Sequence, residues 1–313
     1  MGSGRWSTDA YTAAARYRAA HGMSAFAYSD SGARTAHPAL DPCGVGVREC
    51  RDSNEHPLST PIAVLFDVTG SMGAVPRVLQ TKLPQLLGLL TRKRYATDPQ
   101  ILFGAVGDAT CDRVPLQIGQ FESDNRMDED LARIVLEGGG GGQKRESYEL
   151  AMYFMARHTA LDSVEKRGRR GYLFLIGDEM PYRRVDPCHV GRFLGEEVSR
   201  EAIRTEAILA ELRCAYDVYY VLPTAAGWGG DAEVLSCWRR LLGQNVLELD
   251  DLDAVCETIA LTVGLGEDTI DLDGGLTDLA DLDSAHGSSV RRALAPLQRG
   301  TTVRALPGGD ARR

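Results

Sequence analysis

The chain has 313 residues, with 35 basic and 44 acidic side chains and a formal net charge of −9. This charge opposes binding to a broad polyanion surface, and no apolar run approaches the roughly 18 residues of a membrane helix, so we expect neither nucleic acid nor a membrane as partner. The opening residues lack the apolar stretch of a secretory signal and the seven cysteines form no CxxC pair, which predicts a cytoplasmic protein with reduced thiols.

Residues 1–58 are predicted to form a helix and an extended arm that packs on the core. Residues 8–20 are rich in Ala and Arg, and Ser7 stands where it can cap the start of a helix. The stretch from Ser29 to Pro61 is crowded with Asp, Ser, His and Pro, which indicates little regular structure.

The core begins with a buried strand. Residues 62–66 form a continuously apolar run, which is typical of a strand covered on both faces. A helix with one apolar face follows up to Leu90, and Pro84 is predicted to kink it. Residues 101–107 are a second apolar run, and residues 114–121 are more polar, as suits the edge of a sheet.

The alternation of strands and helices continues to about residue 265. The further predicted strands are 172–176, 218–222 and 246–249. The further predicted helices are 127–135, 147–158, 199–214, 231–242 and 252–263. The pattern predicts an α/β fold: a doubly wound, mostly parallel six-stranded sheet in the order 3-2-1-4-5-6, with the third strand as an antiparallel edge and helices on both faces.

Residues 59–266 thus form the predicted core domain, and residues 267–313 an acidic and then basic C-terminal tail. Seven acids and no Lys or Arg lie between 267 and 283, whereas six Arg and a single Asp follow from 290 onward. Such a composition is typical of a solvated tail. The alternative is a short helix near 290–297 that docks on the protein or on a partner.

Two of the predicted buried strands end in acids. Asp67 follows the first strand and Asp178 the fourth, and these strands are neighbours where the predicted order reverses, the place at which parallel sheets bind ligands. Thr69 and Ser71 add hydroxyl groups. Carboxylates and hydroxyls without His or Cys suit a hard cation such as Mg²⁺. The alternative is that Asp67 and Thr69 only cap the following helix.

The segment Asp67-x-Thr69-x-Ser71 resembles the DxSxS motif of von Willebrand factor A domains, with Thr in place of the first Ser. Ile176-Gly177-Asp178 resembles the later strand-end acid of that family, and the resemblance covers about residues 59–265. It implies a metal-ion-dependent adhesion site, in which hydroxyls bind the ion, strand-end acids often act through water, and a partner's carboxylate completes the coordination. The implied cofactor is Mg²⁺, with Mn²⁺ or Ca²⁺ as alternatives.

The remaining ligand in that family is usually a Thr before a helix; the matching position here is Glu146, with Ser147 as the neutral alternative. The glycine-rich run 138–146 resembles the loop of A domains attached to some atypical kinases, and we expect it to position Glu146. A Glu ligand places up to three carboxylates around the ion and reduces its attraction for a partner's acid. Asp108 and Asp112 are further candidates, although loop turns commonly use such acids.

The resemblance implies a protein-interaction module without enzymatic activity: an adaptor or assembly factor of the intracellular bacterial type, with an AAA+ ATPase of the MoxR kind as candidate partner. The alternative is a haloacid-dehalogenase-like phosphatase, because residues 66–71 also resemble its DxTGT nucleophile motif, with Asp67 as the attacking acid. The second motif of that family, GDxxxD, fails at Tyr182. A structural subunit of a large assembly, tied together by the arm and the tail, is the third hypothesis.

Overall fold

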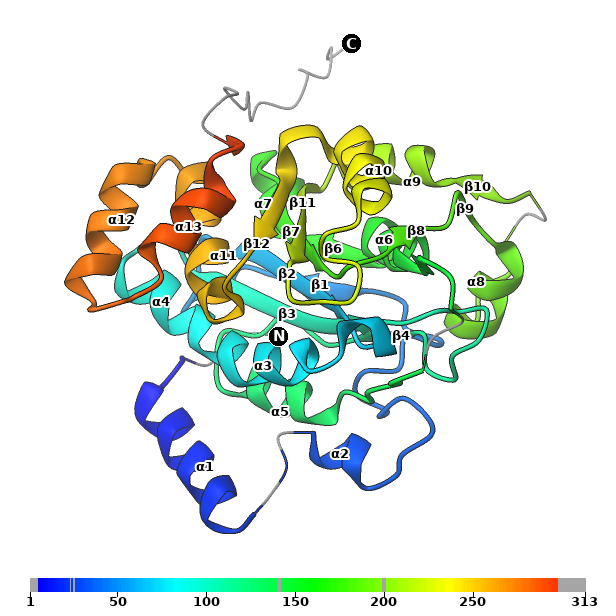
Figure 1. Ribbon diagram of the computed structural model, residues 1–313, viewed down its shortest axis with the longest axis horizontal. Helices are drawn as coiled ribbons and strands as arrows, with labels where there is room; N and C mark the ends of the chain where they lie inside the picture. The colour runs from blue at the N-terminus through cyan, green and yellow to red at the C-terminus, as the bar shows by residue number, and fades with distance from the viewer. Residues whose placement is uncertain (1–4, 23, 25, 140–141, 199–200, 298–313) are drawn as a thin grey trace.

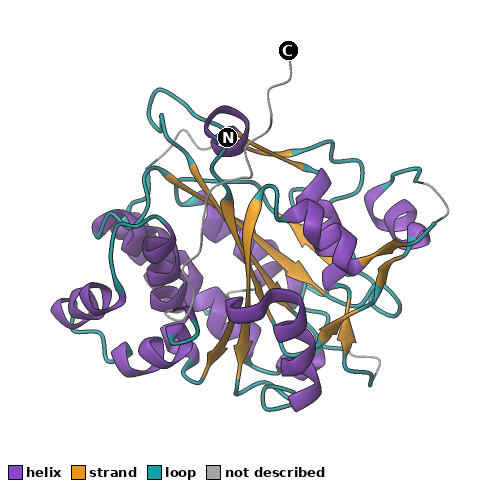
Figure 2. Cartoon of the chain, turned by 90° about the horizontal axis from the view of Figure 1, so that it is seen from above, coloured by secondary structure: helices purple, strands orange, loops and turns teal. Residues whose placement is uncertain are grey.

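The computed structural model describes residues 5–22, 24, 26–139, 142–198 and 201–297. Its centre is a six-stranded sheet in the order β12-β11-β7-β2-β3-β4, seen in the middle of Figures 1 and 2. The strands are β2 (Thr60–Asp67), β3 (Pro99–Val106), β4 (Leu116–Ile118), β7 (Gly171–Ile176), β11 (Tyr216–Pro223) and β12 (Val246–Leu249). All neighbours pair in parallel except β3 with β4. The predicted fold class, strand order and antiparallel edge are therefore confirmed.

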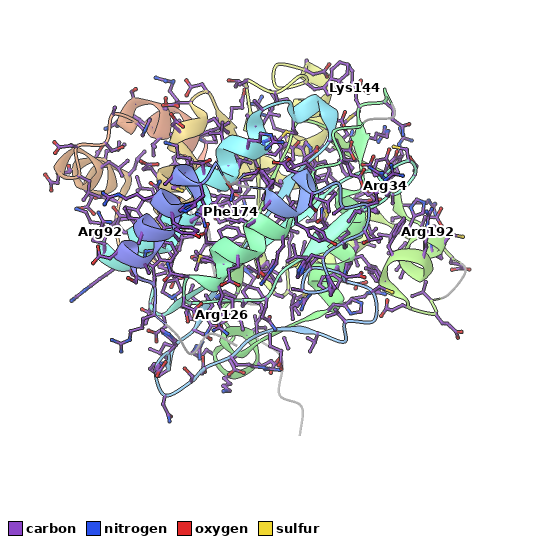
Figure 3. The ribbon with its side chains drawn as sticks, turned by 90° about the horizontal axis from the view of Figure 1, so that it is seen from below. Arg34, Arg92, Arg126, Lys144, Phe174 and Arg192 are labelled. Carbon is purple, nitrogen blue, oxygen red and sulfur yellow. The ribbon has the colours of Figure 1, made fainter. Side chains whose placement is uncertain are left out.

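Helices cover both faces of the sheet, because neighbouring residues along a buried strand point to opposite sides. In β2, Ile62 and Phe66 pack in one hydrophobic cluster, whereas Ala63 and Leu65 pack in the other. The first face carries α3 (Val75–Lys82), α4 (Leu86–Arg92), α5 (Arg126–Arg133) and α11 (Val255–Gly266), and the second α6 (Tyr148–Arg157), α9 (Thr205–Leu212) and α10 (Ala232–Leu242). Figure 1 shows α4 and α11 on the side of the sheet opposite α9 and α10, and Figure 3 shows Phe174 of β7 near the middle of the molecule.

Pro84 interrupts the helix that follows β2, as predicted. Helix α3 ends at Lys82, a 3-10 turn spans Leu83–Gln85, and α4 begins at Leu86. Proline has no N–H group to continue the α-helical hydrogen bonds. One turn of the tighter 3-10 helix therefore separates α3 from α4. The turn keeps both halves on the sheet, because Leu83 and Leu86 are both buried.

Helix α1 (Thr8–Ala20) has the predicted bounds, but the arm after it contains more regular structure than predicted. Strand β1 (Arg48–Cys50) pairs in parallel with β6 (Thr159–Leu161). The N–H of Ile118 in the edge strand β4 donates to the carbonyl of Leu40 at 2.8 Å. The arm thus satisfies backbone groups that an uncovered edge would leave unpaired.

Short elements join the main ones. They are α2 (Ala27–Asp30), α7 (Asp162–Arg167) and α8 (Pro187–Leu194), and the strand pairs β5 (Arg145–Glu146) with β8 (Met180–Pro181) and β9 (Arg184–Val185) with β10 (Ile203–Arg204). The helix predicted over 199–214 begins at Thr205, because β10 occupies the preceding residues; residues 199 and 200 lie outside the described residues.

Among the described helices, none is long and apolar enough to cross a membrane.

Two helices follow residue 266 in the described part of the chain, which corrects the prediction of a solvated tail for residues 267–297. Helices α12 (Leu272–Asp281) and α13 (Gly287–Leu294) bury Leu279 and Val290 in the same cluster as the first face of the sheet. The apolar residues fall at helical spacing between the charged ones, so each helix has an apolar face to pack. The alternative, a short docking helix near 290–297, corresponds to α13, and residues 298–313 lie outside the described residues.

Candidate metal centre

Three buried acids meet beyond the carboxyl ends of β2 and β7. Asp67 ends β2, Glu179 follows β7 and Glu146 ends β5, and each offers one oxygen that lies within 4.8 Å of the others. Strands β2 and β7 are neighbours at the point where the strand order reverses. The acidic centre therefore lies where parallel sheets commonly bind ligands.

Asp67 is held by donors on both of its oxygens. Thr69 donates its N–H and its hydroxyl to Oδ1 at 2.8 and 2.6 Å, and Tyr148 of α6 donates its hydroxyl to Oδ2 at 2.9 Å. Burial raises the pKa of Asp67 to about 7, because the hydrogen bonds from Thr69 do not outweigh desolvation and the nearby acids. Thr69 makes no side-chain capping bond to the following 3-10 turn, so the capping alternative is not what the structure shows.

Asp178 positions a hydroxyl beside this acid. Ser71 donates to Oδ1 of Asp178 at 2.7 Å, the N–H of Trp228 donates to Oδ2 at 2.8 Å, and the hydroxyls of Thr69 and Ser71 are 3.4 Å apart. The structure thus brings together the four residues predicted from the two motifs: Asp67, Thr69, Ser71 and Asp178. Asp178 is not one of the three clustered acids, because its two oxygens face Ser71 and Trp228.

Glu146 and Glu179 are buried acids whose carboxylates are only partly satisfied. Burial is the main cause that raises the pKa of each, and the charge of Asp67 raises that of Glu146 further. Among the described residues, the Oε2 atoms of both are buried without another donor, and the two carboxyl groups can share a hydrogen bond only when one of them is protonated. Buried acceptors without a donor cost free energy, and a divalent cation between them would remove that cost. The donor set, made of oxygens alone, fits a hard cation.

Glu179 is not among the site residues predicted from the sequence. Its Oε1 accepts the indole N–H of Trp228 at 3.1 Å, and its carbonyl accepts the indole N–H of Trp238 at 2.8 Å and the hydroxyl of Tyr220 at 3.1 Å. Tyr220 and Trp238 stack with ring centroids 3.9 Å apart, which gives Glu179 a rigid support. The available signal was a second acid directly after Asp178 at the end of a buried strand.

Ser147, the alternative ligand, has a local partner. Its hydroxyl accepts the N–H of Ala109 at 2.9 Å, and its N–H donates to the carbonyl of Gly107 at 3.2 Å. These bonds tie the start of α6 to the loop after β3. Ser147 therefore fixes the loop that presents Glu146.

Asp108 and Asp112 form a loop turn beside the centre. Oδ1 of Asp108 accepts the N–H of Thr110 at 2.9 Å, and the N–H of Asp108 donates to Oδ2 of Asp112 at 2.7 Å. This is the turn arrangement that the sequence pattern favours. Tyr182, which breaks the GDxxxD motif, donates its hydroxyl to Oδ2 of Asp108 at 3.0 Å.

Close backbone approach shapes the loops of the centre. The N–H of Gly70 donates to the carbonyl of Gly139 at 2.5 Å, and a Cβ at position 70 would lie 2.9 Å from that oxygen. A Cβ at Gly177 would lie 1.8 Å from the Tyr148 hydroxyl that holds Asp67. Larger residues would displace these groups. Residues 140 and 141, the middle of the glycine run that is expected to position Glu146, lie outside the described residues.

Comparisons with known proteins give neither a family nor a function. No protein-family model and no curated protein matches the chain. Among solved structures, the pilus adhesin SpaC from Lactobacillus rhamnosus GG matches at 9% identity with a TM-score of 0.47, and proximal thread matrix protein 1 from the mussel byssus at 11% identity with a TM-score of 0.43. The matches cover 68% and 69% of this chain, but 30% of the adhesin chain and 49% of the matrix protein chain.

Proposed function

We propose that the protein is a metal-dependent protein-interaction module that holds a divalent cation at Asp67, Glu146 and Glu179. The observation that carries the proposal is the meeting of three buried carboxylates, two of which keep an oxygen without a donor among the described residues. Such oxygen ligands favour Mg²⁺, and Mn²⁺ or Ca²⁺ share the preference for oxygen. Proteins rarely bury unpaired acids unless a cation or a proton compensates them.

Each group at the centre has a distinct part in this proposal. The carboxylates of Asp67, Glu146 and Glu179 would hold the cation, and the hydroxyls of Thr69 and Ser71 stand beside them. Asp178 keeps Ser71 in place through the 2.7 Å hydrogen bond. When bound, the cation would offer coordination positions to neutral oxygen ligands of a partner.

The charge balance affects how a partner binds. Three carboxylates more than compensate one divalent cation, so an acidic side chain of a partner gains little by joining the coordination. A partner therefore displaces Glu146 or binds the surrounding loops. By its resemblance to intracellular A domains, we propose an adaptor or assembly role in the cytoplasm, with an AAA+ ATPase as candidate partner.

We propose no catalytic role for these residues. A phosphatase of the haloacid-dehalogenase type needs an acid at the position of Tyr182, whose hydroxyl instead donates to Asp108. We expect no hydrolysis of small phosphoesters in Mg²⁺ at neutral pH. Turnover that is lost in Asp67→Asn, together with a trapped phospho-aspartate, would favour the phosphatase over the interaction module.

Affinity capture tests the proposed function. Wild-type protein in Mg²⁺ is compared with wild-type protein in EDTA, with Asp67→Asn, and with Asp186→Asn, a control in which Asn can preserve the cap of α8. We expect a partner that binds the wild type and the control in Mg²⁺ but is lost in EDTA and in Asp67→Asn. Capture of the same proteins under all four conditions would overturn the proposal.

A further inference from the structure

A surface cavity of about 190 Å³ lies between β8, α9 and α10, beside the acidic centre. Strands β5 and β8 connect the two sites, because Arg145 precedes Glu146 in β5 and pairs with Met180, the residue after Glu179. Successive residues of a strand face opposite sides, so Arg145 lines the cavity while Glu146 belongs to the acidic centre.

Three arginines line this cavity: Arg145, Arg183 and Arg240. Among the described residues, no carboxylate lies within ion-pair distance of their guanidinium groups. Arg145 donates to the carbonyl of Pro181 at 2.8 Å, and a terminal nitrogen of Arg240 lies 3.7 Å from Sγ of Cys237. Each guanidinium group therefore keeps unused donors.

The two acids in the wall of the cavity form ion pairs with cations other than these arginines, although the charge of Arg240 also lowers the pKa of Glu206. Glu206 lies 3.4 Å from Arg204, and Glu233 lies 3.8 Å from Lys144. Lys144, at the margin of the molecule in Figure 3, also pairs with Asp231 at 2.6 Å. The cavity thus keeps an excess of positive charge in a chain whose net charge is −9.

The three arginines share their cavity with one cysteine, Cys237. Cys237 lines the cavity and is partly exposed. Burial raises the pKa of the Cys237 thiol and so does the charge of Glu233, whereas the charges of Arg240, Arg145 and Arg183 lower it. All three arginines thus line the same cavity as Cys237, and Arg240 lies in direct contact with its sulfur atom.

We propose that this cavity is an oxyanion site that binds a phosphate group, carried by a phosphorylated side chain of a partner or by a small phosphate ester. Guanidinium groups bind phosphate oxygens with paired, charge-assisted hydrogen bonds. A phosphate monoester carries a charge of about −1.5 to −2 at neutral pH, which three arginines can balance. The site goes beyond the proposed metal centre and needs no bound cation.

The neighbouring arginine gives a matched control. Arg239 precedes Arg240 in α10 and is exposed, but it pairs with Glu248 at 2.6 Å and is not part of the cavity wall. Two adjacent arginines thus have different roles: one is neutralised by an acid, and the other is left for an anion.

Protection of Cys237 from a maleimide reagent reports binding directly. Labelling of each cysteine is measured by mass spectrometry on the full chain, in EDTA and at constant ionic strength. The probes are inorganic phosphate, an alanine pentapeptide with a central phosphoserine, and the same peptide with serine or glutamate in its place. We expect the two phosphate probes to protect Cys237 in a saturable way, while the exposed thiols of Cys43 and Cys188 stay reactive.

Substitution of the arginines identifies the site. Arg183→Gln and Arg240→Gln should each weaken the protection by about tenfold or more, as expected for the loss of a charged hydrogen-bond donor. Arg239→Gln should leave the protection unchanged. Because these side chains are exposed, melting of each variant is expected to match the wild type and to confirm that the fold is intact.

The probes also separate the two sources of phosphate. Tighter binding of the phosphoserine peptide than of inorganic phosphate supports a phosphorylated partner, and equal binding supports a small phosphate ester. The proposal is overturned if no probe protects Cys237, if the glutamate peptide protects it as well as phosphoserine, or if Arg239→Gln weakens binding as much as Arg240→Gln. Since EDTA is present throughout, neither result depends on the metal centre.

Discussion

At the scale of single residues, the acidic centre consists of three carboxylates that repel one another in the protein interior. Asp67, Glu146 and Glu179 are at most 4% exposed, and the pKa of each is raised by burial. Hydrogen bonds from Thr69 and Tyr148 hold Asp67, and Glu179 accepts one from the indole of Trp228. The centre therefore needs either protons or a cation to compensate its acids, and we propose a cation.

The choice between Glu146 and Ser147 as ligand can be tested by substitution. Glu146→Thr should weaken the affinity for Mg²⁺ or Mn²⁺, because it removes a charged ligand, and should strengthen capture of an acidic partner. Ser147→Ala should keep the metal affinity but lower the free energy of unfolding by about 1 kcal/mol, since its hydroxyl accepts the N–H of Ala109. The opposite pattern in a metal titration would make Ser147 the ligand.

Glu149 should make stability depend on pH. Burial raises its pKa from 4.5 to about 8, so the folded protein binds this proton more tightly than the unfolded chain. The free energy of unfolding should therefore fall as pH rises from about 4.5 to 8. Glu149→Gln can still accept the N–H of Tyr182, and we expect it to be more stable than the wild type above pH 8, by up to a few kcal/mol.

Denaturant unfolding in EDTA, measured across this pH range, gives the comparison. The control is Glu129→Gln, an exposed acid of α5. If the curves of the wild type and Glu149→Gln run parallel from pH 4.5 to 8, the pKa of Glu149 is not raised as described.

Two acids of the site, Asp67 and Asp178, could be predicted from the sequence, whereas Glu179 could not. Asp67 and Asp178 end apolar strands, and the register of parallel strands brings such ends together. Glu179 was missed because sequence position alone does not tell which of two adjacent acids turns toward a site. That choice depends on Trp228 and Trp238, which lie far along the chain and hold Glu179.

At the scale of elements, long apolar runs were predicted well and very short strands were not. The six strands of the sheet carry enough buried residues to show a pattern. By contrast, β5, β8, β9 and β10 have two residues each and depend on partners distant in sequence. One of these pairs, β5 with β8, joins the acidic centre to the arginine cavity, so the sequence could not reveal that the two sites are neighbours.

Helix α13 offers a test of the folded C-terminal region. Leu294 is fully buried against the core, so Leu294→Ala should lower the free energy of unfolding by about 2–5 kcal/mol. Arg291→Ala, on the exposed side, removes only an open ion pair with Asp273 and should change stability by about 0.5 kcal/mol or less. Equal stability of both variants in denaturant unfolding would mean that α13 does not pack on the domain.

At the scale of the whole molecule, one edge of the sheet presents two sites of opposite charge. The acidic centre and the arginine cavity are joined by β5 and β8, and Lys144 next to them reaches Asp231 and the ring of Trp228.

The central claim is that the acidic centre binds a divalent cation. Its most direct test is thermal unfolding of the wild type in EDTA and in saturating Mg²⁺ or Mn²⁺, beside Asp67→Asn and the Asp186→Asn control. At about 100 times Kd, a bound cation adds roughly 2.7 kcal/mol to the free energy of unfolding, so the wild type and the control should melt at higher temperature with the cation, and Asp67→Asn should not. Identical wild-type melting curves in EDTA and in both cations would contradict the account.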